Sequence, residues 1–300
     1  METTRLFLWT LILVATTCHL CQGDEDTDIW SSGNDVIQLS MMNDSAAYIY
    51  TQSEESDRLA TEYLAKECEN NKVLDNAWKT ALSLRQTDPR LSKVPVPRGL
   101  REEHVVALIA YTLPNKLCSQ FNVAMRKYGA NDSVYAEKFP FKGFQYLLSV
   151  AIERVREDFG LTPRPTYRGM QKESFGEVGS RMKFGCFTSS SRTKGKKFGT
   201  KTVFTIFSQY GAQIQNYSFY PKEEEVLIPP YEAFKIMSYK RRADGVDISL
   251  QTDGVAGIRV RVERGSNGEM RVLRYEETSV SPWVWLPILK WLYEVLLRFL

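Results

Sequence analysis

The spacing of apolar residues changes once along the chain, after Pro163. Before this point they recur every three or four positions, the period of a helix face, which predicts helices at 54–85, 101–112, 121–128 and 144–159. Beyond it, short β-branched and aromatic runs predict strands at 202–207, 225–229, 233–239, 255–264 and 271–275, the last two joined by a turn at 265–268. Helices followed by strands predict an α+β fold, and without a long linker we expect a single domain over 24–280.

The composition is that of a globular protein, because 43% of the 300 residues are hydrophobic and 25% are charged. The net charge of +3 comes from 39 basic and 36 acidic side chains, which argues against a nucleic-acid partner. One of the two histidines, His19, lies in a segment that we expect to be cleaved. A metal site built from several histidines is therefore excluded, and no metal is expected.

The N-terminus has the layout of a secretory signal peptide. Arg5 precedes an apolar run at 6–15, and an acidic stretch begins at Asp24. We expect residues 1–23 to be removed and the protein to enter the secretory pathway, to act outside the cell or at its surface; the alternative is an N-terminal core helix.

Export changes how the remaining cysteines and the glycosylation sequons are interpreted. Cys68, Cys118 and Cys186 are an odd number, so at most one internal disulfide can form, and its pairing stays open. Three Asn-x-Ser sequons predict N-glycosylation; they begin at Asn43, Asn131 and Asn216.

The C-terminal tail, 281–300, is apolar and rich in tryptophan. Lys290, Glu294 and Arg298 are four residues apart and fall on one helical face. This pattern predicts an amphipathic helix that associates with a membrane surface. A helix docked on its own domain or on a partner gives the same pattern.

Three local motifs could carry chemistry, although each also has an ordinary structural explanation. Arg168 follows two prolines on a predicted strand and offers a planar donor fork suited to phosphate, or it forms a salt bridge. The hydroxyl run at 188–191 can orient a carboxylate, or it is a solvated turn. Glu223 and Glu225 would share one face if strand alternation already holds there, or the run of three glutamates is a solvated loop.

Familiar hydrolase, P-loop, metalloprotease and dinucleotide-binding motifs are absent from the sequence. His104 is the one histidine outside the signal segment. Because it lies in a predicted helix beside Val105 and Val106, we expect a helix-surface or capping role for it.

Taken in order, the three motifs resemble a known signature. Arg168, then Phe-Thr-Ser-Ser-Ser, then Glu-Glu-Glu-Val-Leu-Ile-Pro-Pro resemble the Arg, Ser-x-Ser and Glu-x-Glu motifs of the arginine-specific mono-ADP-ribosyltransferases, most closely the vertebrate ecto-enzymes. The resemblance covers most of 35–275. It implies N-terminal helices packed on two facing, roughly orthogonal β-sheets with NAD in the cleft between them. It also implies a reaction in which NAD and an arginine-containing protein give ADP-ribosyl-arginine and nicotinamide.

By the same resemblance, Arg168 would clamp the pyrophosphate of NAD and Ser189 would orient Glu225. The Glu225 carboxylate would stabilise the positive charge that develops on the ribose, and Glu223 would hold the acceptor arginine and take up its proton. Two further residues are expected to contact NAD, Tyr111 and Ser218.

The chain departs from these relatives in its cysteines. Residues 255–280 lack the cysteine that would pair with Cys68, and Cys186 stands where relatives often carry a polar residue. Two alternatives to the transferase stay open: an NAD glycohydrolase, in which water replaces arginine, and a secreted binding module that keeps the fold without turnover.

Overall fold

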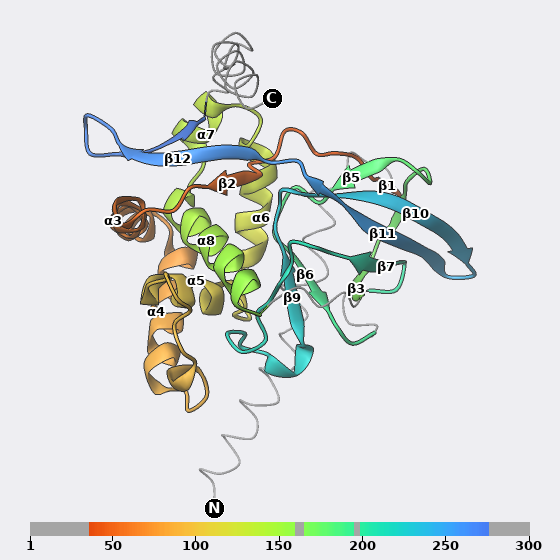
Figure 1. Cartoon of the computed structure of the whole chain (residues 1–300), viewed down its shortest axis with the longest axis horizontal. Helices are drawn as coiled ribbons and strands as arrows, with labels where there is room; N and C mark the ends of the chain where they lie inside the picture. Colours follow the sequence, from red (N-terminus) through yellow and green to blue (C-terminus); the bar gives the residue numbers. More distant parts are fainter. Residues whose placement is uncertain (1–35, 160–164, 195–198, 276–300) are drawn as a thin grey trace, which may run out of the picture.

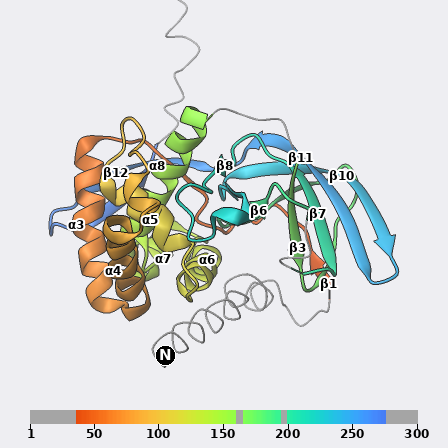
Figure 2. The ribbon, with the colours of Figure 1, turned by 90° about the horizontal axis from the view of Figure 1, so that it is seen from below.

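The computed structural model describes residues 36–159, 165–194 and 199–275, with the helices on one side and most of the strands on the other (Figures 1 and 2). The expected signal peptide at 1–23 and the tail at 281–300 lie outside the described residues. Within the described residues, no helix combines the length and the apolar character needed to cross a membrane.

The helical part of the described chain contains six α-helices. They are α3 (Glu54–Asn70), α4 (Lys72–Thr87), α5 (Glu102–Tyr111), α6 (Leu117–Tyr128), α7 (Asp132–Lys138) and α8 (Lys142–Phe159). All four predicted helical stretches are confirmed, but 54–85 is divided at Asn71. The Asn71 side chain accepts hydrogen bonds from the backbone N–H groups of Val73 and Leu74, and so begins a new helix. Helix α7 was missed because seven residues are too few to show a period.

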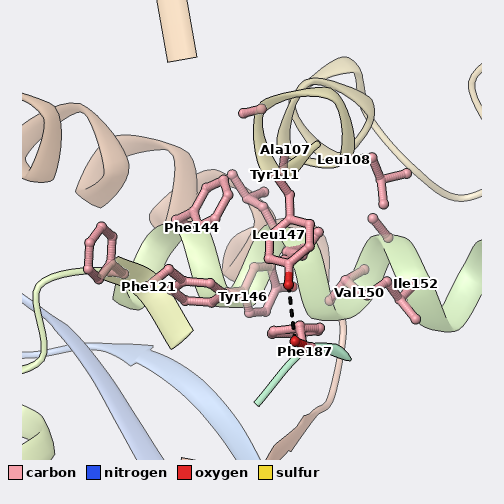
Figure 3. Packing of buried hydrophobic residues seen from close by; sticks show 14 of the residues in the cluster. Ala107, Leu108, Tyr111, Phe121, Phe144, Tyr146, Leu147, Val150, Ile152 and Phe187 are labelled. Carbon is pink, nitrogen blue, oxygen red and sulfur yellow. Dashed lines mark hydrogen bonds between the residues drawn. The ribbon is translucent and has the colours of Figure 1, made fainter. Parts of the chain in front are cut away.

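Aromatic side chains dominate the core of the helical part. Figure 3 shows Phe121, Phe144 and Leu147 packed together with Phe187, which directly precedes the strand β6 (Thr188–Ser191). The Phe121 and Phe187 rings stack with centroids 5.6 Å apart. Burying side chains of this size contributes about 1.5–3 kcal/mol each, so this contact attaches the strands to the helices.

His104 is buried in this core, so the predicted surface position is wrong and the predicted capping role is confirmed. Its Nδ1 accepts the backbone N–H of Arg101 at 3.1 Å, and its Nε2 lies 3.3 Å from Asp57 Oδ1. Burial alone would raise the pKa of Asp57, but hydrogen bonds from His104, Tyr146 and Gln52 outweigh it and hold that pKa below its usual value. The cluster joins α3, α5 and α8.

A second buried carboxylate gives stability a pH dependence. Glu67 accepts hydrogen bonds from the backbone N–H groups of Gly143 and Phe144 at the start of α8, and burial raises its pKa from 4.5 to about 8. Between these values the folded protein keeps a proton that the unfolded chain has lost. Stability should therefore fall as the pH rises through that window.

Replacing Glu67 with glutamine removes the titration and keeps one acceptor oxygen, so one of the two N–H groups, which bond to different carboxylate oxygens in the wild type, loses its partner. We therefore expect Glu67→Gln to be less stable than wild type near about pH 5, and its stability to fall between about pH 5 and pH 9 by at least ~1.4 kcal/mol less than that of wild type, the equivalent of one pKa unit. Urea unfolding at both pH values measures the difference. A parallel pH dependence in the two proteins would contradict the assignment.

The strands form one eight-stranded sheet in the order β5-β10-β11-β7-β3-β6-β9-β8, with a three-stranded sheet β13-β12-β2 and a pair β1-β4. Their bounds are β1 (Val36–Gln38), β2 (Tyr48–Tyr50), β3 (Thr166–Met170), β4 (Glu173–Phe175), β5 (Arg181–Lys183), β6 (Thr188–Ser191), β7 (Thr202–Phe207), β8 (Ala212–Gln213), β9 (Glu225–Ile228), β10 (Glu232–Arg242), β11 (Gly245–Val255), β12 (Ile258–Arg264) and β13 (Met270–Arg274). The predicted α+β class is confirmed. The predicted β12–β13 hairpin is also confirmed, with Val260 and Val262 buried and Arg259 and Arg261 exposed.

The eight-stranded sheet has a weak junction between β3 and β6. These two strands pair through a single residue couple, Tyr167 with Ser191, whereas β3 pairs with β7 over five residues. The sheet therefore consists of a five-stranded part and the three-stranded part β6-β9-β8. The two predicted sheets correspond to these parts, which are continuous through that one couple.

Candidate active site

The structure brings three sequence-predicted residues onto adjacent strands at this junction. Arg168 lies on β3, Ser189 on β6 and Glu225 at the first position of β9 (Figure 1). Strand β6 pairs with both neighbours, Ser191 standing opposite Tyr167 on one side and opposite Glu225 on the other. Residues far apart in the sequence thus meet where the two parts of the sheet join.

Arg168 is fixed directly against the serine strand. Its guanidinium Nη1 donates to the backbone oxygen of Ser189 at 2.8 Å, and the residue is only 8% exposed. The next residue, Gly169, lets the Gly199 backbone approach, because a Cβ on Gly169 would lie 2.1 Å from the Gly199 oxygen. The local sequence therefore keeps Arg168 in one place beside β6.

Ser218, predicted as an NAD contact, donates a hydrogen bond to Glu225. Ser218 Oγ lies 3.2 Å from Glu225 Oε2, and both residues are buried. Ser189 stands opposite Leu227, one diagonal step from Glu225 on the same face of the β6–β9 pair. In this register Ser189 and Glu225 are diagonal neighbours, about 7–8 Å apart along the strands. The orienting role of Ser189 stays a prediction.

A turn separates the two acids, so they do not lie on one continuous strand. Glu223 ends a short 3₁₀ turn at Pro221–Glu223, and Glu224 has left-handed backbone with φ of 46°. As a result Glu223 and Glu225 are buried while Glu224 points to solvent. Ser191 Oγ donates to the Glu223 backbone oxygen at 2.7 Å and fixes this turn to β6. A left-handed non-glycine residue costs about 1–2 kcal/mol, so the turn is held by its contacts.

Tyr111 lies beside Phe187, the residue that precedes β6. Its hydroxyl donates to the Phe187 backbone oxygen at 3.1 Å (Figure 3) and accepts from Asn122 Nδ2 at 3.1 Å. Burial raises the pKa of Tyr111 well above its usual value, so the hydroxyl stays protonated and able to donate. The structure gives Tyr111 and Asn122 a role in placing the segment that leads into β6, and a contact between Tyr111 and NAD stays a prediction.

Cys186, on the same segment, is buried against Arg126, whose Nη2 lies 2.8 Å from the sulfur. Among the described residues, Cys68, Cys118 and Cys186 form no disulfide with one another. No group of three or more His, Cys, Asp or Glu side chains that could hold a metal occurs in the described parts of the chain.

The residues on these adjacent strands are those of the three sequence motifs. Comparison with known proteins supports the resemblance of these motifs to the ADP-ribosyltransferases. A profile of the family NAD:arginine ADP-ribosyltransferase matches residues 40–256. The GPI-linked NAD(P)(+)--arginine ADP-ribosyltransferase 1 of Mus musculus is 36% identical over 188 residues, which are 60% of this chain and 58% of the mouse protein. The ecto-ADP-ribosyltransferase 5 of Bos taurus is 33% identical over 63% of this chain and 62% of its own length.

Solved structures agree with the sequence relatives. The eukaryotic mono-ADP-ribosyltransferase ART2.2 superimposes with a TM-score of 0.59 and 26% identity, covering 71% of this chain and 93% of that one. A variant of ART2.2 in complex with NAD superimposes with a TM-score of 0.60 over the same shares. The fold is therefore that of the ADP-ribosyltransferases, while the match extends over less than two thirds of the mouse and bovine proteins.

Proposed function

Because the chain belongs to the NAD:arginine ADP-ribosyltransferase family, we propose that it transfers ADP-ribose from NAD to arginine side chains of proteins and releases nicotinamide. The observation that carries the proposal is the convergence of Arg168, Ser189 and Glu225 on three adjacent strands, with Glu223 beside them. ART2.2, which has this fold, is a mono-ADP-ribosyltransferase, and a variant of it binds NAD.

The chemistry requires a carboxylate where positive charge develops. Cleavage of the nicotinamide–ribose bond gives the ribose oxocarbenium character, and a fixed carboxylate stabilises that charge more in the transition state than in the ground state. Glu225 suits this task, since it is buried and accepts a hydrogen bond from Ser218. Arg168 would hold the pyrophosphate, because a guanidinium presents paired donors to phosphate oxygens.

A second carboxylate suits an arginine acceptor. The guanidinium is always charged near neutral pH and is a poor nucleophile until a base takes up a proton as it attacks. Glu223 lies two residues from Glu225, and both are buried while Glu224 between them is exposed. This pairing favours transfer over hydrolysis by water.

The test is an assay of the purified protein with NAD labelled in the adenylate moiety and an arginine-rich acceptor. A transferase labels the acceptor and releases nicotinamide in equal amounts. Nicotinamide release without labelling would support the glycohydrolase, and neither product would support the binding module.

We also propose that the protein is exported and carries N-glycans. The predicted acceptors Asn43, Asn131 and Asn216 are all exposed. The mouse relative is described as GPI-linked and the bovine one as an ecto-enzyme, which supports a position at the cell surface. Membrane association through 281–300 is part of this proposal. An N-glycosidase that increases the gel mobility of the expressed protein would support glycosylation, and unchanged mobility would contradict it.

A further inference from the structure

The helical part of the protein reaches the segment that holds Glu225. Arg90 follows the end of α4, and its guanidinium donates from Nη1 to the Asn216 oxygen at 2.8 Å and from Nη2 to the Ser218 oxygen at 2.7 Å. These two backbone carbonyls belong to the segment 216–220, which precedes the acidic turn. Because the planar guanidinium donates to two carbonyls of the segment 216–220, it fixes both the position and the orientation of that segment.

The same segment is anchored at further points. Thr112, at the end of α5, accepts the Phe219 backbone N–H on its Oγ1 at 2.9 Å. The Ser218 backbone N–H bonds to the Ile214 oxygen at 2.9 Å, and Ser218 Oγ accepts the Tyr220 N–H at 3.1 Å. With the carbonyl held by Arg90 and the N–H held by Ile214, Ser218 has its backbone fixed on both sides while its hydroxyl donates to Glu225.

The arginine itself is held in place. Asp88 Oδ1 accepts the backbone N–H groups of Arg90 at 2.9 Å and of Leu91 at 2.8 Å, and Leu91 is buried in the helical core. The position of the Arg90 backbone is therefore fixed by the fold of the connection between α4 and α5. The helical part is thus linked to the Glu225 carboxylate on β9 through Arg90 and Ser218.

We infer that Arg90 is a positioning residue of the proposed reaction, acting through Ser218 on the Glu225 carboxylate. The inference rests on the proposed function, because it assigns Arg90 to the transition-state geometry of that site. Ser218 transmits this positioning, and its predicted contact with NAD stays a prediction.

A double-mutant cycle separates positioning from a general structural role. Arg90→Ala should lower kcat for nicotinamide release by about 10- to 100-fold, the value of one hydrogen bond to a charged group, with KM for NAD within about twofold. Ser218→Ala should cause a loss of similar size. Because both act on the same carboxylate, Arg90→Ala should cost little further in the Ser218→Ala background. Arg90→Lys, which keeps the charge but lacks the fork, should recover part of the loss.

Arg58→Ala is the matched control. Arg58 lies exposed on α3 and pairs with Glu55 and Glu62, and its removal should leave kcat within about twofold of wild type. Circular dichroism and thermal unfolding of each variant verify the fold. Full activity of Arg90→Ala, or losses that multiply in the double variant, would overturn the inference. An inactive wild type would instead refute the proposed function.

Discussion

Replacement of Glu225 with alanine is expected to lower nicotinamide release from NAD by about 10²–10³-fold. A loss of this size is typical when one preorganised group that stabilises a developing charge is removed. The structure gives the carboxylate one location, since Glu225 is 5% exposed and hydrogen-bonded to Ser218. Both arginine transfer and NAD hydrolysis pass through this bond cleavage, so both should fall together. Steady-state assays of the two products measure the effect.

Glu225→Gln tests the same residue with nearly unchanged shape, and the exposed neighbour provides the control. Glu224→Gln removes one negative charge from the same turn, one residue away, and should keep activity within about twofold because its side chain points to solvent. Near-wild-type cleavage by Glu225→Gln, or equal losses in both glutamine variants, would be inconsistent with the role given to Glu225.

Glu223→Gln is expected to separate the two activities. Transfer to arginine should fall by about 10²-fold, because a general base in the transition state contributes about 10²–10⁴-fold. Hydrolysis of NAD should change by less than about threefold, since Glu225 and Arg168 keep their places. Counting labelled acceptor and released nicotinamide in one reaction gives the ratio directly. Losses of equal size in both products would remove the acceptor role of Glu223 and favour the glycohydrolase.

The sequence was sufficient to predict the parts of the fold that depend on local patterns. The alternation of Val260 and Val262 with Arg259 and Arg261 predicted β12, because one face of that strand is buried and the other is in water. Short elements did not give such a pattern. Helix α7 has seven residues, and the break at Asn71 depends on one capping side chain.

The sequence motifs predicted which residues lie on neighbouring strands, but not the contacts between them. The order of Arg168, the serine run and the glutamates indicated which residues would meet. The sequence does not contain the strand register, which sets Ser189 opposite Leu227, nor the hydrogen bond from Ser218 to Glu225. Arg90 gave no sequence signal, since an arginine after a helix is ordinary until the 216–220 segment lies beside it.

Arg168, Ser189 and Glu225 are proposed to form one binding site for NAD. A crystal structure of the Glu225→Gln variant with NAD tests this site, because the variant should bind the substrate without cleaving it. We expect the pyrophosphate against the Arg168 guanidinium and the nicotinamide ribose beside residue 225. NAD bound elsewhere on the protein, with Arg168 and residue 225 both out of its reach, would contradict the account.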